Sequence, residues 1–173
     1  EIKSVLYLLS KISNNHHRSP QFFDKIGQIF QIFKDDIQKY FSSYEIFKIF
    51  RKNKRILLLL IENQIISVDK TIVNVLKSEK YYTAKYPLYF FPEIKPFTDE
   101  NLVQNLSKEI PENFDKKRKI GENDSKICEL IRNGSLDDFT SYIEQTKFPL
   151  SSEIEPSIFE TNSFLVNKKP TLI

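Results

Sequence analysis

The chain has 173 residues, of which 40% are hydrophobic and 28% are charged, and its formal net charge is +3. This length allows one ordinary domain, or one domain and the start of another, and the hydrophobic content excludes disorder throughout. The excess of 26 basic over 23 acidic residues is milder than a committed nucleic-acid binder usually shows.

Apolar residues at three- and four-residue steps predict four helices in the first half of the chain. The first covers 2–13, and the second begins at a Ser19-Pro20 start signal and continues as one stripe to Tyr40. The third covers 44–65, and the fourth, capped by Ser67, follows it to about residue 76. Short breaks favour antiparallel neighbours, so we predict an all-α antiparallel helical bundle or solenoid-like array.

The next segment, YYTAKYPLYFFPEIKPF at 81–97, is rich in proline and aromatic residues. Its three prolines exclude a regular helix and its aromatic side chains require burial, so we predict an extended strap lying over the helices. Stacking of these aromatics on bases is the alternative, and covering the core is favoured. Thr98 then caps a further helix that Pro111 ends.

Two basic clusters leave a choice between a charged surface and a nucleic-acid contact. The run at 116–119 has acidic neighbours on both sides and is predicted to belong to a charged linker at 116–122. The cluster at 51–55 lies on a predicted helix, is interrupted by Asn53 and spreads over more than one face. Both clusters therefore favour solvated surfaces, and nucleic acid is the less favoured partner.

The sequence offers no catalytic, cofactor or metal constellation, so we expect a protein that is not an enzyme. His16 and His17 are adjacent loop residues and lack the spacing of zinc ligands. The pairs at 35–36 and 137–138 are neighbouring aspartates on helices, where side chains diverge. The single cysteine, Cys128, excludes an internal disulfide and fits a reducing compartment. The longest apolar run, 56–61, is too short to span a membrane.

A pair of short helices joined by a glycine turn is predicted at 124–146. Asp124 or Ser125 caps the first helix, and Gly134 ends it because glycine enters the left-handed region without strain. Ser135 begins the second helix, and Asp138 completes a carboxylate version of the capping box. The predicted apolar faces of the two helices consist of Ile127, Leu130, Ile131, Leu136, Phe139, Tyr142 and Ile143.

This stretch, SKICELIRNGSLDDFTSYIEQT, resembles a degenerate ankyrin repeat. Residues 125–127 stand where the repeat has Thr-Pro-Leu, and 132–134 fall on the turn between its helices. Leu130 and Ile131 replace the usual alanines, and Thr146 replaces the final glycine. Bulky residues at the alanine positions would push neighbouring repeats apart, so the unit suits the end of an array.

The wider stretch 116–173, together with FFPEIKPF, resembles large ankyrin-repeat proteins of trichomonad-type protists, in which a helical region precedes the repeats. This resemblance makes KPTLI the first step into a following repeat, with Thr171 at its threonine position. The step from Ser125 is longer than the repeat of roughly 33 residues, so the connection 147–169 is expected to hold a long loop.

These observations predict three parts: a helical domain at 1–115, the charged linker at 116–122, and the ankyrin-like helix pair with its loop at 123–173. We expect a non-catalytic protein–protein interaction module at the amino-terminal flank of an ankyrin array, whose partners are other proteins and the following repeats. The alternative is a basic nucleic-acid-associated helical domain. The expected location is intracellular, with the cytoplasm favoured over the nucleus.

Overall fold

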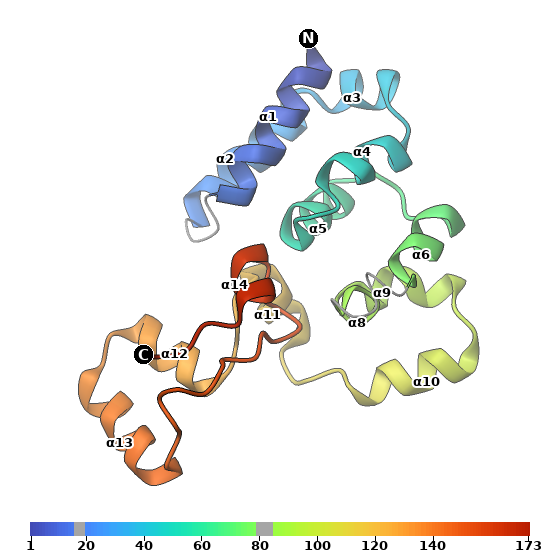
Figure 1. Ribbon diagram of the computed structural model, residues 1–173. Coiled ribbons are helices and arrows are strands. Elements are labelled where there is room, and N and C mark those ends of the chain that lie inside the picture. The colour runs from blue at the N-terminus through green and yellow to red at the C-terminus, as the bar shows by residue number, and fades with distance from the viewer. Residues whose placement is uncertain (16–19, 79–84) are drawn as a thin grey trace.

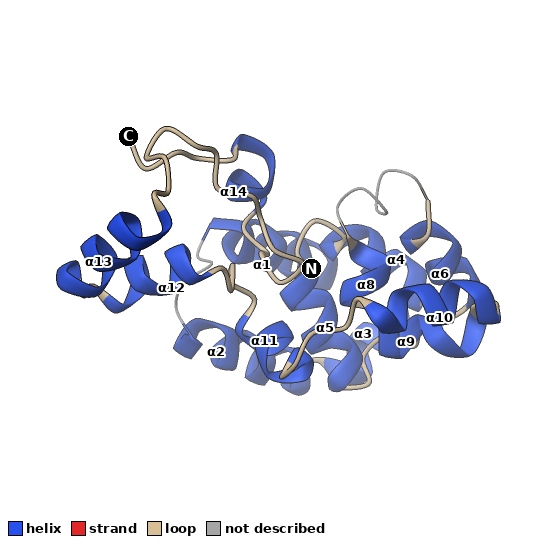
Figure 2. Cartoon of the chain, turned by 90° about the horizontal axis from the view of Figure 1, so that it is seen from below, coloured by secondary structure: helices blue, strands red, loops and turns tan. Residues whose placement is uncertain are grey.

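The computed structural model describes residues 1–15, 20–78 and 85–173, and every regular element within these ranges is a helix (Figures 1 and 2). The predicted all-α class is therefore confirmed. The helices are α1 (Ile2–Asn15), α2 (Pro20–Ile32), α3 (Lys34–Tyr40), α4 (Ser43–Phe50), α5 (Lys54–Glu62), α6 (Lys70–Leu76), α8 (Tyr86–Tyr89), α9 (Phe91–Ile94), the 3-10 helix η1 (Lys95–Phe97), α10 (Glu100–Lys108), α11 (Phe114–Ile120), α12 (Lys126–Asn133), α13 (Leu136–Thr146) and α14 (Ser163–Lys168).

Helix α5 lies at the centre of the fold because the middle of its sequence, ILLLLI, is continuously apolar and most of it is buried. It contacts α2, α4 and α11, while α1 packs on α4. Several helices that pack together are thus distant in sequence. The predicted solenoid-like array, in which successive helix pairs would stack in chain order, stays a prediction. The side chains that α5 buries are Lys54, Ile56, Leu57, Leu58 and Leu60.

Two helices predicted as continuous are each divided in the structure. The stripe from 20 to 40 breaks at Phe33 into α2 and α3. The helix predicted at 44–65 breaks before Asn53, whose Oδ1 accepts a hydrogen bond of 3.1 Å from Ile56 N. Its Nδ2 donates to Ser13 O at 3.1 Å, so this buried amide both begins α5 and ties it to the end of α1. The helical spacing of apolar residues continues across such breaks, so it does not reveal them.

Aspartates rather than the predicted hydroxyl residues cap α6 and α10. Asp69 accepts from Ile72 N at 2.8 Å, and Asp99 accepts from Leu102 N at 3.0 Å. The predictions of Ser67 and Thr98 as caps were therefore wrong. In each case a carboxylate one or two residues closer to the helix satisfies its first free N–H groups.

The predicted extended strap is wrong in form, although its burial is confirmed. Of the segment 81–97, residues 81–84 lie outside the described ranges, and the rest forms α8, α9 and η1. Each of these short helices has a proline at its first or second position, where the missing N–H needs no partner. The aromatic side chains of α8 and α9 still enter the core, and Tyr89 is fully buried, whereas Phe97 of η1 is exposed.

Helices α12 and α13 project from one end of the molecule, opposite α6 and α10 (Figures 1 and 2). The chain then returns to the helical part, where the ring of Phe159 lies 5.7 Å from that of Phe114. The connection predicted as a loop at 147–169 therefore contains an anchored segment and the helix α14. The last residues pair with its beginning, because Ile154 N donates to Pro170 O and Leu172 N donates to Leu150 O.

We predict that Asn53→Ala lowers the free energy of unfolding more than Ser42→Ala does. Each variant removes a helix cap, which costs about 1 kcal/mol. Asn53 is buried and its loss also leaves Ser13 O without its donor, which adds roughly 1–2 kcal/mol. The capping box of Ser42 is exposed to water and serves as the matched control. Urea unfolding measures both losses, and equal losses would contradict the role given to the buried amide.

Candidate functional site

The helix pair α12–α13 folds as a hairpin about Gly134, and the two helices contact each other extensively. Gly134 has φ +68°, the left-handed conformation expected of it, and its N–H donates to Leu130 O and Ile131 O. Ser135 begins α13, with its Oγ accepting from Asp138 N at 3.4 Å. Ser125 stands at the start of α12, but its side chain does not cap the helix, and its buried Oγ has no hydrogen-bond partner among the described residues.

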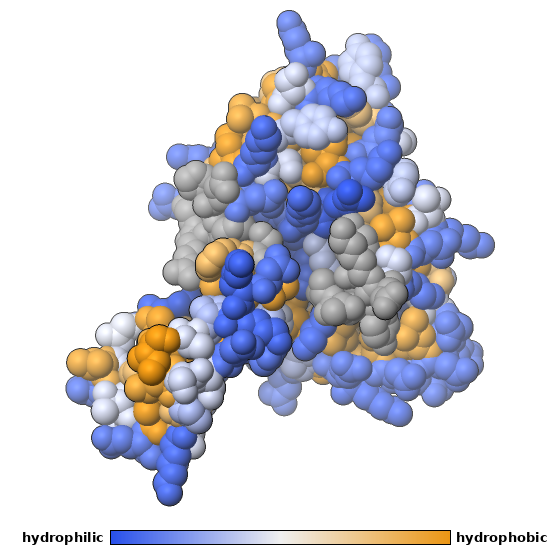
Figure 3. All heavy atoms as spheres, in the orientation of Figure 1, coloured by the Kyte–Doolittle hydropathy of each residue, from blue (hydrophilic) through white to orange (hydrophobic). Residues whose placement is uncertain are grey.

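The apolar side chains of the pair divide into a buried and an exposed set. Ile127 and Leu130 of α12 are buried, whereas α13 buries no residue. Two of the predicted face residues are open to solvent, since Ile131 is 48% exposed and Leu136 is 74% exposed. The remaining three, Phe139, Tyr142 and Ile143, are half-buried. In the space-filling view, apolar atoms gather on the lobe where Figure 1 places α12 and α13 (Figure 3).

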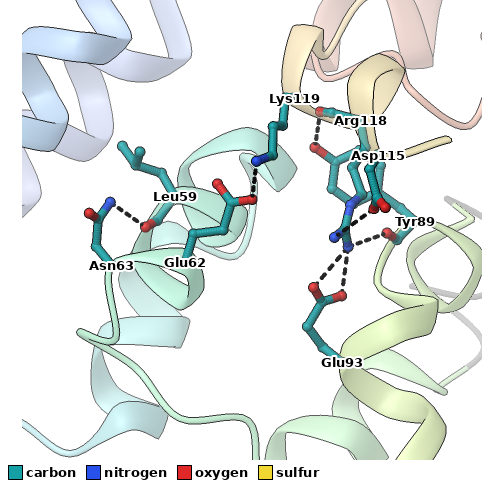
Figure 4. A network of polar contacts seen from close by, with 8 residues as sticks. All are labelled: Leu59, Glu62, Asn63, Tyr89, Glu93, Asp115, Arg118 and Lys119. Carbon is teal, nitrogen blue, oxygen red and sulfur yellow. Dashed lines mark hydrogen bonds and ion pairs between the residues drawn. The ribbon is translucent and has the colours of Figure 1, made fainter. Parts of the chain in front are cut away.

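The basic run at 116–119 belongs to helix α11, so the prediction of a linker there was wrong. Arg118 is buried, and its Nη1 lies 2.7 Å and 2.9 Å from the two carboxylate oxygens of Glu93 (Figure 4). The same nitrogen donates to Tyr89 O at 3.2 Å, and the phenol of Tyr89 donates to Arg118 O at 2.8 Å. This network joins α11 to α8 and α9. The charge of Arg118 is therefore paired inside the fold and does not face solvent.

Three other basic side chains of the two clusters also make contacts within the fold, whereas Arg51, Lys52 and Lys116 are exposed. Lys117 pairs with Asp124 at 2.7 Å, and Lys119 pairs with Glu62 at 3.0 Å. The guanidinium of Arg55 lies 3.7 Å from the centre of the Phe23 ring, the shortest cation–π contact in the described residues. These contacts give the basic clusters a structural explanation.

Lys54 is a buried lysine at the start of α5, and no pattern in the sequence indicates its burial. Its Nζ lies 5.1 Å and 5.5 Å from the rings of Tyr86 and Tyr89 and donates to Ile158 O at 3.3 Å. Burial lowers the pKa of Lys54 from 10.5 to about 7, against the opposing effect of the negative charge of Glu160. Lys54 therefore joins the segment around 155–161 to the helical core.

A pocket of about 490 Å³ lies between α12, the turn at 121–123, the segment 154–165 and the last residues of the chain. Its walls are mainly apolar, and three charged side chains, Glu122, Arg132 and Glu160, line it. The sequence does not reveal this site, because its parts become neighbours only when the segment after α13 returns. The one local signal is Gly121, a rare glycine that adopts φ +72° beside the pocket.

The remaining residues considered in the sequence do not form a further site. His16 and His17 lie outside the described residues. Among the residues that the structure describes, histidine, cysteine and carboxylate side chains nowhere gather in a group of three that could hold a metal ion. Cys128 is half-buried, and the aspartates at 35–36 and 137–138 are mostly exposed. In the same described ranges no helix has the length and apolarity needed to cross a membrane.

Comparisons with protein-family models, with curated proteins and with solved structures give no match for this chain. The resemblance to ankyrin-repeat proteins therefore stays an expectation from the sequence, and the functional inference depends on the geometry described above.

We predict that Gly121→Ala destabilises the protein more than Gly134→Ala. Both glycines have positive φ, where a Cβ costs about 1–2 kcal/mol. At Gly134 the added Cβ meets no atom within 4 Å, whereas at Gly121 it lies 3.1 Å from Arg55 Cδ and 3.2 Å from two Thr161 side-chain atoms. Thermal unfolding of the two variants measures the difference. Equal melting temperatures would show that the contact between Gly121 and Thr161 contributes little.

We predict that Lys54 makes the protein more stable as the pH rises above 7. Between pH 7 and 10.5 the unfolded chain holds a proton at this site that the folded chain has lost. Stability therefore rises with pH in this window, by up to about 1.4 kcal/mol per pH unit, and is unaffected by this site below it. Urea unfolding from pH 7 to 9.5 should show this rise in the native chain and its loss in Lys54→Met.

The matched control for this measurement is Lys52→Met, because Lys52 is an exposed lysine two positions away. Its pH profile should run parallel to that of the native chain. A parallel profile for Lys54→Met would instead show that the amine keeps its ordinary pKa in the folded state.

Proposed function

We propose that this chain is a non-catalytic protein-interaction module whose α12–α13 hairpin acts as an ankyrin-like repeat at the end of an array. The observation that carries the proposal is the exposed apolar surface of the hairpin, above all Leu136 and Ile131. In repeat proteins each unit buries its apolar face only when a neighbouring unit stacks on it. The hairpin has the two short helices and the glycine turn of such a unit.

Stacking of a partner on the exposed face would bury apolar side chains and so contribute a substantial free energy of association. Leu136, Ile131 and Leu150 are all large apolar residues exposed to solvent on or directly after the hairpin. Burying one such side chain completely contributes about 1.5–3 kcal/mol. Because α13 buries no residue of its own, an added helix pair would complete its packing. We therefore infer that the partner is a second helix pair of ankyrin type.

The contacts of the basic clusters favour this function over nucleic-acid binding. Arg118 and Lys54 are buried, and Lys117 and Lys119 are paired with acidic side chains. Arg51, Lys52 and Lys116 are exposed, but they are divided between the two clusters. Such residues contribute little to a phosphate-binding surface, which needs several accessible cations side by side. Salt-sensitive binding of the chain to DNA or RNA would nevertheless support the nucleic-acid alternative.

We predict that consensus ankyrin repeats, fused after Ile173, unfold together with the α12–α13 hairpin. Stacking couples neighbouring repeats, so the fusion should show one transition at a higher temperature than either part alone. The double variant Ile131→Glu, Leu136→Glu should uncouple the parts and lose about 3 kcal/mol of coupling. Hydrogen exchange at α12 and α13 identifies which transition they join.

The matched control changes two exposed polar residues on the opposite side of α13 from Leu136, Ser141→Glu and Gln145→Glu, which adds the same charge without altering the apolar face. This control fusion should remain coupled. Two independent transitions in the native fusion, each at the temperature of its separate part, would falsify the stacking of an ankyrin-type unit on this face.

A further inference from the structure

The pocket beside α12 has the size and lining of a small-ligand site. Its volume of about 490 Å³ falls within the range of ligand pockets, which are mostly apolar with a few convergent polar groups. The apolar walls come from elements far apart in the sequence, including Ile131 of α12, Leu165 of α14 and Leu172. It adjoins the exposed face of the hairpin, and Ile131 belongs to both.

Glu160 is the polar group that distinguishes this pocket. Glu160 is only 5% exposed. Its Oε1 accepts a hydrogen bond from Asn162 N at 2.7 Å, and its Oε2 accepts one from Asn123 N at 3.3 Å. Among the described residues, no lysine or arginine nitrogen lies within the 4.0 Å of an ion pair with this carboxylate. Burial raises the pKa of Glu160, with the backbone hydrogen bonds opposing the rise. A buried carboxylate without an ion pair is costly, and a cation in the pocket would offset that cost.

The other two charged side chains that line the pocket neutralise each other. Arg132 Nε lies 3.0 Å from Glu122 Oε2, so this guanidinium is already neutralised. Its Nη1 donates to Asn123 O at 2.7 Å, which fixes it at the wall. The charge left over in the pocket is therefore that of Glu160. Lys54, the buried amine whose charge interacts with that of Glu160, is held by Ile158 O instead.

We propose that this pocket binds an alkylammonium group, with the cationic head at Glu160 and the apolar stem against Ile131, Leu165 and Leu172. A free aliphatic amine and a lysine side chain of a protein partner share this chemistry. An anion is disfavoured because the described residues that line the pocket include no unpaired cation to receive it. The proposal differs from repeat stacking in its deciding residue, Glu160, which lies outside the hairpin, whereas Ile131 is shared by the pocket and the stacking face.

Titration of the full chain with hexylammonium, followed by amide chemical shifts in NMR, tests this proposal. We expect shifts centred on Gly121, Cys128 and Leu165, with a Kd on the order of 1 mM for so small a ligand. Hexanol, which has the same stem without the charge, should bind about tenfold more weakly, and hexanoate should not bind. Binding of hexanol as tight as that of hexylammonium, or the absence of shifts in the pocket, would overturn the proposal.

The variant Glu160→Gln removes the charge and keeps a carbonyl oxygen for one of the two backbone donors. It should weaken hexylammonium binding about tenfold, which is the effect of losing a charged hydrogen-bond partner. Glu155→Gln is the matched control, because Glu155 lies on the same segment, pairs with Lys169 at 2.8 Å and does not line the pocket. Equal binding by Glu160→Gln and the native chain would also overturn the proposal. If Glu160→Gln fails to fold, the comparison of hexylammonium with hexanol on the native chain still decides the question.

A second titration with Nα-acetyllysine amide distinguishes the two sources of the amine. Tighter binding of the lysine derivative would assign the pocket to a side chain of a protein partner, and tighter binding of hexylammonium would assign it to a free amine. If neither binds in the pocket, the inference fails, while the fusion experiment on the hairpin still gives an independent answer on repeat stacking.

Discussion

The burial of helix α5 is the constraint on which the rest of the structure depends. Ile56, Leu57, Leu58 and Leu60 are buried on more than half of its circumference, and only the side with Arg55 and Glu62 reaches water. Other helices must therefore surround it, and α2, α4 and α11 do so. Because apolar burial is roughly proportional to the area removed from water, this requirement outweighs the tendency of successive helices to pack in chain order.

Covering α5 also draws charged residues out of water, and the protein resolves their burial in two ways. The Nη1 of Arg118 is paired with both carboxylate oxygens of Glu93 and donates to Tyr89 O, while its buried Nε has no hydrogen-bond partner among the described residues. Lys54 instead has a lowered pKa and gives its proton up more readily, with two tyrosine rings and Ile158 O beside it. Both solutions tie distant segments to the core, since Glu93 belongs to α9 and Ile158 follows α13. Breaking a buried pair of this kind leaves an uncompensated charge, which makes the arrangement specific.

The segment that returns after α13 connects the core to both proposed functional surfaces. Thr161 donates to Gly121 O through its N–H at 3.2 Å and its hydroxyl at 2.7 Å, which fixes the segment against the turn before α12. This anchoring places Glu160 in the pocket beside α12, while α13 remains outside with Leu136 exposed. One side of the hairpin is thus completed by the chain itself, and the other is left for a partner. A fixed hairpin is better prepared for stacking than a mobile one, because less conformational entropy is lost on binding.

The sequence by itself determined the helical class, the turn at Gly134 and the start of α13 at Ser135, because periodicity, positive φ and capping are local properties. It also indicated that the aromatic segment around Tyr89 is buried, but not that prolines begin short helices there, since proline is compatible with either form. Only the tertiary structure decided that Asn53 divides a predicted helix, that Arg118 lies in a helix and pairs with Glu93, and that Glu160 reaches a pocket next to α12. In each of these cases the residue is held by a partner that is far away in the chain. The neighbours of a side chain in the sequence do not reveal whether folding will bury it.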